Sequence, residues 1–355
     1  MVSEQEMSKT GTGNFFEDFR VGQLIQHATP RTLSAGDAAL YQGLFGARFA
    51  VQSSDAFAQA IGYPRAPIDD LLVFHIVFGK SVPDISLNAV ANLGYASGRF
   101  LAPVYPGDTL NSISEVIGLK ENSSRKTGIV FVRTSGCRQD GTKALEYVRW
   151  VMVRKRDEAA AAPGDHVPRL PQAVAASTLG DACPRINGNA YDVALAGSRF
   201  RFDDYAVGEK IDHVDGVTVE EAEHQIATRL YQNTARIHFN QFIEGKGRFG
   251  RRLVYGGHVI SLARALSFNG LANAFHVAGI NGGRHVAPLF AGMTVFAWSQ
   301  VLDKAQLPGR DDVGALRLRT VATKDHPCAD FPLKSGDEDH PAVLLELDYW
   351  VLMPR

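Results

Sequence analysis

One sequence motif occurs twice in the chain, and this duplication constrains the fold more than any other feature. The first copy covers residues 94–110 and the second covers residues 279–295, at an offset of 185. Seven of the seventeen positions are identical: Gly94/Gly279, Gly98/Gly283, Arg99/Arg284, Ala102/Ala287, Pro103/Pro288, Gly107/Gly292 and Thr109/Thr294. Such a match predicts two copies of one domain in a single chain.

The repeat extends over most of the sequence. Further matches occur in the same order in both halves, at offsets of 185 to 200: residues 16–27 with 202–213, 40–42 with 230–232, and Trp150 with Trp350. The 355 residues suffice for two domains. We therefore expect a disordered tail over residues 1–14, an N-terminal domain over 15–156, a linker over 157–198 and a C-terminal domain over 199–355. The linker composition fits an ordered or a disordered path equally well.

Each copy predicts the same order of elements. A short strand over 16–27 or 202–213 precedes a helix, for which Ser34 to Asp37 and Thr218 to Glu221 fit the capping-box pattern. An apolar, buried helix follows over 70–78 or 256–271. Strands then close each copy, at 129–134 and 144–153 in the first, and at 295–301, 316–322 and 343–352 in the second. An antiparallel sheet wrapped around one buried helix, formed twice, is an α+β double hot-dog fold, in which the two sheets join as they do in hot-dog dimers.

The composition excludes several classes of protein. Lys and Arg number 37 against 38 Asp and Glu, so bulk electrostatics does not favour a nucleic-acid partner. The three cysteines are far apart and indicate no zinc site or disulfide framework. The first 14 residues do not resemble a signal peptide, and no apolar run has the length of a membrane span. We expect a cytoplasmic protein without a membrane partner, and pairing of whole chains into a homo-oligomer.

The segment with the most chemical information follows the capped helix of the second copy. Residues 230–239 read Leu-Tyr-Gln-Asn-Thr-Ala-Arg-Ile-His-Phe, and residues 251–261 read Arg-Arg-Leu-Val-Tyr-Gly-Gly-His-Val-Ile-Ser. This pattern resembles the MaoC-like, (R)-specific enoyl-CoA hydratases, whose motif S-G-D-x-N-P-x-H places Asn233 at the Asp position and His238 at the His position. Gly256 and Ser261 match the family's Gly and its central-helix Ser. The full segment over residues 230–239 is similar to that of bacterial mesaconyl-CoA hydratases, also called β-methylmalyl-CoA dehydratases.

Hydration of an α,β-unsaturated thioester needs a base for water, an acid for Cα and a donor to the enolate oxygen. Histidine suits proton transfer near neutral pH, which indicates His238. Backbone N–H groups at Gly256 and Gly257 suit the oxygen, because a missing Cβ permits close approach of a carbonyl. Ser261 is the third catalytic candidate implied by the resemblance. Asn233 departs from the family because an amide exchanges no proton; its structural alternative is a left-handed helix C-terminus.

The first copy carries no equivalent chemistry. Gly43 and Arg48 occupy the positions of Asn233 and His238, so we expect this copy to be catalytically empty and to complete the substrate pocket. The resemblance implies a substrate with a free carboxylate, for which Arg236 and Arg48 are the candidates. The basic run over 246–252 supplies three candidates for the phosphates of coenzyme A: Arg248, Arg251 and Arg252. Each arginine is otherwise a solvated surface charge. We expect no metal and no cofactor beyond the coenzyme A of the substrate.

Four functions remain open on the residues alone. The first is reversible hydration of mesaconyl-CoA to β-methylmalyl-CoA, and the second is hydration or dehydration of another enoyl-CoA or acyl-carrier thioester. A hot-dog thioesterase is the third, and it needs an acid near the central helix, for which Asp69 or Asp70 is available. A non-enzymatic acyl-CoA sensor is the fourth.

Overall fold

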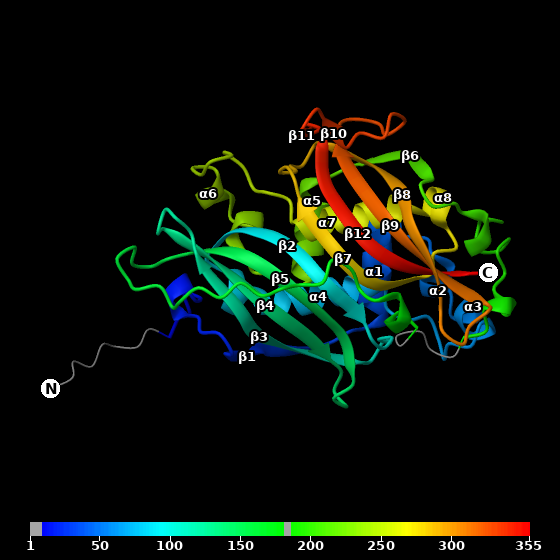
Figure 1. Cartoon of the computed structure of the whole chain (residues 1–355), viewed down its shortest axis with the longest axis horizontal. Helices are drawn as coiled ribbons and strands as arrows, with labels where there is room; N and C mark the ends of the chain where they lie inside the picture. The colour runs from blue at the N-terminus through cyan, green and yellow to red at the C-terminus, as the bar shows by residue number, and fades with distance from the viewer. Residues whose placement is uncertain (1–8, 181–185) are drawn as a thin grey trace.

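The computed structural model describes residues 9–180 and 186–355. Their main feature is one antiparallel ten-stranded sheet that passes through both halves (Figure 1), in the order β1-β3-β4-β5-β2-β7-β12-β9-β8-β6. The first half contributes β1 (Leu24–Thr32), β2 (Ala89–Phe100), β3 (Thr109–Glu121), β4 (Thr127–Cys137) and β5 (Lys143–Arg154). The second contributes β6 (Lys210–Thr218), β7 (His276–His285), β8 (Thr294–Gln306), β9 (Val313–Lys324) and β12 (Val343–Pro354). The predicted double hot-dog fold is confirmed.

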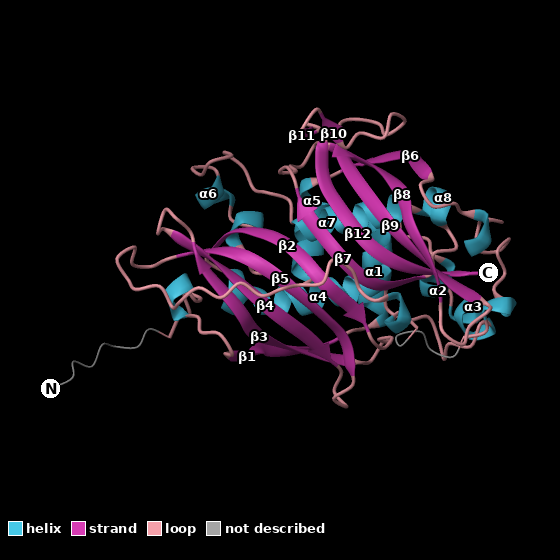
Figure 2. Ribbon diagram, viewed as in Figure 1, coloured by secondary structure: helices cyan, strands magenta, loops and turns pink. Residues whose placement is uncertain are grey.

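The α-helices are α1 (Ala35–Phe45), α2 (Ala50–Ser53), α3 (Asp55–Ala60), α4 (Asp70–Ser81), α5 (Glu221–Leu230), α6 (Gln241–Glu244), α7 (Gly256–Leu266) and α8 (Phe268–Leu271). The central helices α4 and α7 pack against one face of this sheet (Figure 2), whereas α6 stands apart from it. A small hairpin, β10 (Lys334–Ser335) and β11 (Glu338–Asp339), projects beside β12. No helix in the described ranges is long and apolar enough to cross a membrane.

The repeated motif forms the seam between the halves. Its first part lies on β2 and β7, which pair with each other, Tyr95 opposite Gly283 and Arg99 opposite Gly279. A Cβ on Gly98 would lie 2.9 Å from the Ile280 Cβ. The glycines of the motif therefore permit two strands to approach closely at the joint, which explains why the motif recurs in both copies.

The central helices are buried, as predicted, but their ends differ from the prediction. α4 continues beyond Phe78 to Ser81 and then into a π turn over Val82–Ser86. α7 ends at Leu266 rather than at Leu271, because Asn269 and Gly270 leave the helical conformation and Gly270 has φ +105°.

Two further predictions near the strand starts are wrong. Residues Phe16–Asp18 and Phe202–Asp204 form 3-10 turns, because the Asp18 and Asp204 carboxylates accept from the backbone N–H of Phe15 and Arg201; the strands begin only at β1 and β6. The second capping box is also absent, since Thr218 belongs to β6, where its hydroxyl meets that of Thr294 at 2.8 Å. The first is present: the Asp37 N–H donates to Ser34 Oγ at 3.1 Å.

The linker runs along both halves. In the described ranges, His166 bridges to Leu119, the Val174 N–H donates to Asn281 Oδ1 at 2.7 Å, and the Gly188 N–H donates to Asp312 Oδ2 at 2.6 Å. These contacts favour the ordered alternative, whereas residues 181–185 lie outside the described part. The tail prediction falls largely on residues 1–8, also outside it, while Asn88 Nδ2 donates to the carbonyls of Thr12 and Asn14.

Candidate active site

His238 lies in a 3-10 turn, Arg236–His238, in the loop that follows α5. Its side chain is buried, and Nδ1 lies 2.8 Å from the Leu253 carbonyl oxygen. A carbonyl only accepts, so Nδ1 must carry the proton, and the neutral ring presents Nε2 as an acceptor. The local fold thereby fixes the tautomer that can take a proton from water.

Burial lowers the pKa of His238 from 6.5 to about 4, although the hydrogen bond to Leu253 opposes this shift. The imidazole is therefore neutral at pH 7. Once protonated, it becomes a strong acid, because the same burial destabilises its charged form. A single histidine in this environment can accept a proton from water and return it readily.

Asn233 is buried in the same loop and has a fixed orientation. Its Oδ1 accepts from the Ala235 N–H at 3.0 Å, so Nδ2 is left to donate. The left-handed residue at the end of α5 is Gln232, with φ 54°, so the left-handed alternative is wrong for Asn233. Asn233 can orient water or a thioester oxygen as a donor.

Helix α4 of the first half supports this loop from behind. A Cβ on Gly79 would lie 2.9 Å from the Tyr231 carbonyl carbon and 3.1 Å from the Asn233 nitrogen, closer than side chains pack. Next to it, Lys80 Nζ donates to Gln232 Oε1 at 3.2 Å and to the Thr29 carbonyl. The first half therefore sets the position of the loop that carries Asn233 and His238.

Gly256 and Gly257 begin α7, where the first N–H groups have no intrahelical acceptor. The structure gives a different reason for the glycines than the predicted approach of a substrate carbonyl. A Cβ on Gly256 would clash with the ring of His285, and one on Gly257 with the rings of Tyr255 and His75. The missing side chains admit aromatic rings of the chain itself, and the oxyanion role of the N–H groups stays a prediction.

Ser261 lies deeper along α7. Its hydroxyl accepts from the Tyr41 hydroxyl at 2.8 Å and lies 3.0 Å from His75 Nε2, with both partners in the first half. Burial keeps His75 neutral, with its pKa lowered to about 3. Ser261 thus joins the two halves and makes no hydrogen bond to His238 within the described ranges, so its catalytic role stays a prediction.

The predicted arginines separate into different places. Arg236 is exposed in the same turn as His238. Arg48 stacks on Phe268 at 4.5 Å, beyond the C-terminal end of α7, whereas His238 packs beside the N-terminal end. Eleven residues of helix span about 16 Å, so Arg48 lies far from His238, and its binding of the substrate carboxylate stays a prediction.

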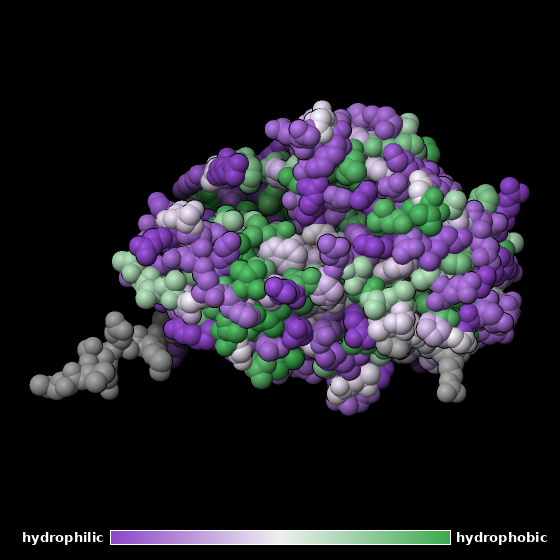
Figure 3. Space-filling view, in the orientation of Figure 1, coloured by the Kyte–Doolittle hydropathy of each residue, from purple (hydrophilic) through white to green (hydrophobic). Residues whose placement is uncertain are grey.

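The basic loop carries its three arginines in different states. Arg248 and Arg251 are exposed, and Arg251 stacks on Phe290 at 4.0 Å. Arg252 is bound within the chain, to Glu221 at 2.6 Å and to the Phe239 carbonyl at 3.4 Å. Beside α6, Figure 3 shows a hollow in the surface with a hydrophobic floor. Arg248 and Arg251 are free to meet phosphates at this side, whereas Arg252 already has a carboxylate partner.

The two acidic residues near α4 have structural partners. Asp69 caps the helix by accepting from the Leu71 N–H at 2.9 Å, and burial raises its pKa to about 6. Asp70 accepts from the Val277 N–H at 2.9 Å and lies 3.0 Å from His276 Nδ1. No contact of either carboxylate in the described ranges reaches His238.

Two residues near the start of α7, Tyr255 and His285, were missed from the sequence. The Tyr255 ring packs against His238 with centroids 5.5 Å apart, and His285 Nε2 lies 3.3 Å from the Tyr95 hydroxyl. Burial lowers the pKa of His285 to about 4. The sequence held a signal for His285, because the repeated motif has Phe100 at that position in the first copy.

Comparisons of the sequence with known proteins match a family of hydratases over nearly the whole chain. The family model described as "Mesaconyl-CoA hydratase" matches residues 4–339. The chain is 63% identical to a β-methylmalyl-CoA dehydratase of Chloroflexus aurantiacus over 350 residues, 98% of this chain and 99% of that one. It is 60% identical to a mesaconyl-CoA hydratase of Cereibacter sphaeroides over 351 residues, 98% of this chain and 100% of that one.

Two solved structures resemble the fold over nearly the whole chain. A MaoC domain protein dehydratase from Chloroflexus aurantiacus superposes with a TM-score of 0.95 at 63% identity and covers 98% of this chain and 99% of its own. A conserved Mycobacterium tuberculosis protein with a double hotdog fold superposes with a TM-score of 0.78 at 26% identity, over 97% of this chain and 99% of its own.

Proposed function

Since the chain belongs to the mesaconyl-CoA hydratase family, we propose that it catalyses the reversible hydration of mesaconyl-CoA to β-methylmalyl-CoA. The enzyme is thus a hydro-lyase that acts on a coenzyme A thioester. The observation that carries the proposal is His238, a buried neutral imidazole whose Nδ1 is bound to a carbonyl and whose Nε2 is available as a base.

The residues around His238 supply each step. Nε2 takes a proton from water as the oxygen bonds to the carbon β to the thioester, and the double-bond electrons move toward the thioester oxygen. The N–H groups at the start of α7 stabilise the resulting enolate oxygen. The His238 imidazolium then returns its proton to Cα, and the sequence of steps reverses for dehydration. Asn233 Nδ2 holds the water or the thioester oxygen in place.

The test is direct. Purified protein is incubated with mesaconyl-CoA, and loss of the enoyl thioester absorbance is followed together with mass detection of the hydrated product. Absorbance loss with formation of β-methylmalyl-CoA supports the proposal. No turnover of either this substrate or its product would reject it. A panel of other enoyl thioesters in the same assay separates the proposed substrate from its relatives, and release of free thiol would indicate a thioesterase instead.

We further propose that the reaction uses no separate cofactor, because His238 and backbone donors supply the chemical steps. An unchanged rate after dialysis against a chelator supports this. A homo-oligomer in the cytoplasm is proposed as well, since coenzyme A thioesters are made and consumed there and hot-dog domains commonly pair. Light scattering of the purified protein and cell fractionation test the two statements.

A further inference from the structure

Arg149 is a buried cation without a carboxylate partner. It lies on β5 in the first half, is 0% exposed, and its guanidinium stacks over the Phe78 ring at 4.2 Å. Its hydrogen bonds reach only hydroxyls, to Ser81 Oγ at 2.8 Å and to Ser86 Oγ at 3.3 and 3.4 Å. Among the described residues, no carboxylate forms an ion pair with it. A buried charge of this kind is costly unless an anion joins it.

Further buried donors surround this arginine. Tyr95, Tyr147 and Tyr255 are close enough to affect the electrostatics of Arg149. Arg149 Nε and the Tyr255 hydroxyl are both buried, and neither has a hydrogen-bond partner in the described part of the chain. A cation beside an unpartnered hydroxyl is a donor set that suits a carboxylate.

The cluster is connected to the catalytic histidine through two aromatic rings. Phe78, which carries Arg149 on its face, packs against Tyr255 with centroids 5.6 Å apart. Tyr255 in turn packs against His238 with centroids 5.5 Å apart. Arg149 is therefore linked to His238 by a continuous series of packed rings.

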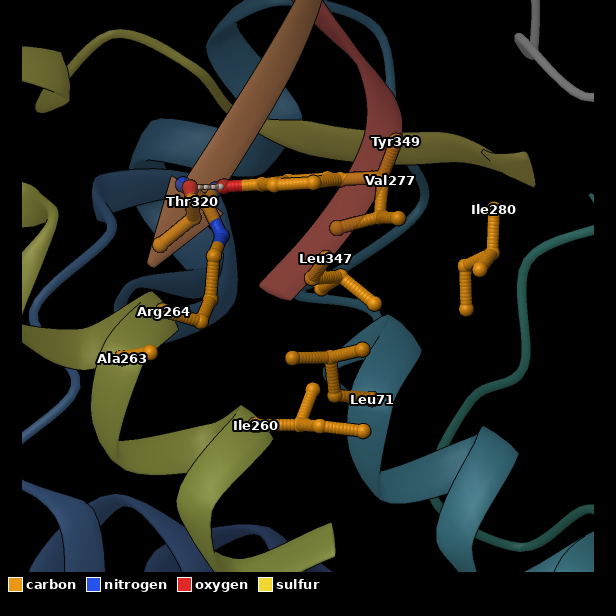
Figure 4. Close-up of a pocket in the computed structure, with 9 residues that line it drawn as sticks. All are labelled: Leu71, Ile260, Ala263, Arg264, Val277, Ile280, Thr320, Leu347 and Tyr349. Carbon is orange, nitrogen blue, oxygen red and sulfur yellow. Dashed lines mark hydrogen bonds between the residues drawn. The ribbon is translucent and has the colours of Figure 1, made fainter. Parts of the chain in front are cut away.

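The structurally equivalent position in the second half offers a comparison, because no substrate group is expected to bind there. Arg264 is the ninth residue of α7 and corresponds to Phe78, the ninth residue of α4. Asp69 directly precedes α4 and corresponds to Tyr255, which directly precedes α7. On the strands, Tyr349 pairs with Ile280 in the same way that Arg149 pairs with Tyr95, so Tyr349 is the residue that corresponds to Arg149. Figure 4 shows Arg264 in a small cavity with Tyr349, whose hydroxyl binds Thr320 at 3.1 Å.

The two arginines, Arg264 and Arg149, thus differ in whether a carboxylate lies near them. Arg264 lies close enough to Asp69 for its charge to offset part of the rise that burial causes in the pKa of the Asp69 carboxyl, and its own hydrogen bonds go to Ser267 and the Ala274 carbonyl. Beside Arg149 the corresponding position is the neutral Tyr255. Asp69 of the first half thus supplies a carboxylate near Arg264, whereas no carboxylate among the described residues affects the pKa of Arg149.

From this asymmetry we infer that Arg149, together with the Tyr255 hydroxyl, binds the free carboxylate of the substrate. This inference rests on the proposed function and deepens it, since mesaconyl-CoA carries a carboxylate on the carbon that receives water. The interaction selects enoyl thioesters with a distal carboxylate over those with an alkyl group. The candidate chosen from the sequence, Arg236, is exposed and needs no such partner.

The test compares two substrates in three variants. kcat/KM is measured for mesaconyl-CoA and for crotonyl-CoA, which lacks the carboxylate, in the wild type, Arg149→Met and Arg236→Met. Arg149→Met should lose at least about 100-fold on mesaconyl-CoA and keep or gain activity on crotonyl-CoA, because a site built for a polar group discriminates strongly. Thermal unfolding of each variant verifies folding, and Arg149→Lys, which keeps the charge, should show an intermediate loss.

The outcomes separate the two proposals. If the wild type does not hydrate mesaconyl-CoA, the proposed function fails. If the wild type does so and Arg149→Met keeps the wild-type substrate preference, only the role of Arg149 is overturned. Equal losses on both substrates in folded Arg149→Met and Arg149→Lys would also overturn it, as would a loss of preference in Arg236→Met alone.

Discussion

Replacing Gly79 by alanine tests whether the first half positions the catalytic loop. The added Cβ would lie 2.9 Å from the Tyr231 carbonyl carbon and 3.1 Å from the Asn233 nitrogen. The nearest atom is the Tyr231 carbonyl oxygen, which the Cβ would overlap, so the loop or α4 must move by more than about 1 Å to restore an ordinary contact of about 3.5 Å. Overpacking of this kind costs about 1–3 kcal/mol of stability. A displacement near 1 Å costs on the order of 100-fold in rate.

The assay measures kcat and KM for mesaconyl-CoA together with urea unfolding. Gly43→Ala is the matched control, because a Cβ there meets nothing within 4 Å and the position is exposed on α1. That change should keep the rate and stabilise the helix by about 0.5–1 kcal/mol. Wild-type kcat in Gly79→Ala, at unchanged stability, would refute the idea that α4 sets the loop.

Three further predictions concern the site and the buried histidines. Arg48→Met should change kcat/KM by less than about twofold, since Arg48 lies beyond the far end of α7; a loss of tenfold or more would contradict this placement. Asn233→Asp should lower kcat at least about tenfold because a donor is lost, and the acid limb of its pH profile should move upward because a carboxylate raises the pKa of His238. Folding stability should fall as pH drops from 6.5 toward 4, because the unfolded state takes up protons first, by about 1.4 kcal/mol per pH unit and histidine. Urea unfolding at several pH values checks this, and a flat profile would exclude it. The histidines concerned are His75, His213, His238, His258 and His285.

The duplication could be predicted from the sequence because β2 and β7, which pair where the two halves meet, both require small residues there. A Cβ on Gly279 of β7 would lie 3.1 Å from the Gly98 carbonyl oxygen of β2, so the repeated glycines reported a structural contact. The buried helices were equally readable, since they lack a polar face. Their ends were not, because the end of α7 depends on the conformation of Asn269 and Gly270, which the apolar pattern does not contain.

The site was predicted in part for a related reason. A local motif placed Asn233 and His238 in one loop, because the spacing of five residues lies within a single segment. Arg149 and Tyr255 belong to segments about a hundred residues apart, so only the packing of α4 against the second half brings them near each other. Arg48 lies apart from His238 because its alignment with His238 indicates an equivalent position in the other half, not proximity.

The most direct test of the account is the rate of mesaconyl-CoA hydration by His238→Ala. General acid–base catalysis by one side chain contributes about 10²–10⁴-fold, so kcat should fall within or beyond this range. The variant should still bind the thioester, since the loop is also held by Gly79 and Lys80. A folded His238→Ala protein that hydrates mesaconyl-CoA at near the wild-type rate would contradict the assignment of His238 as the base.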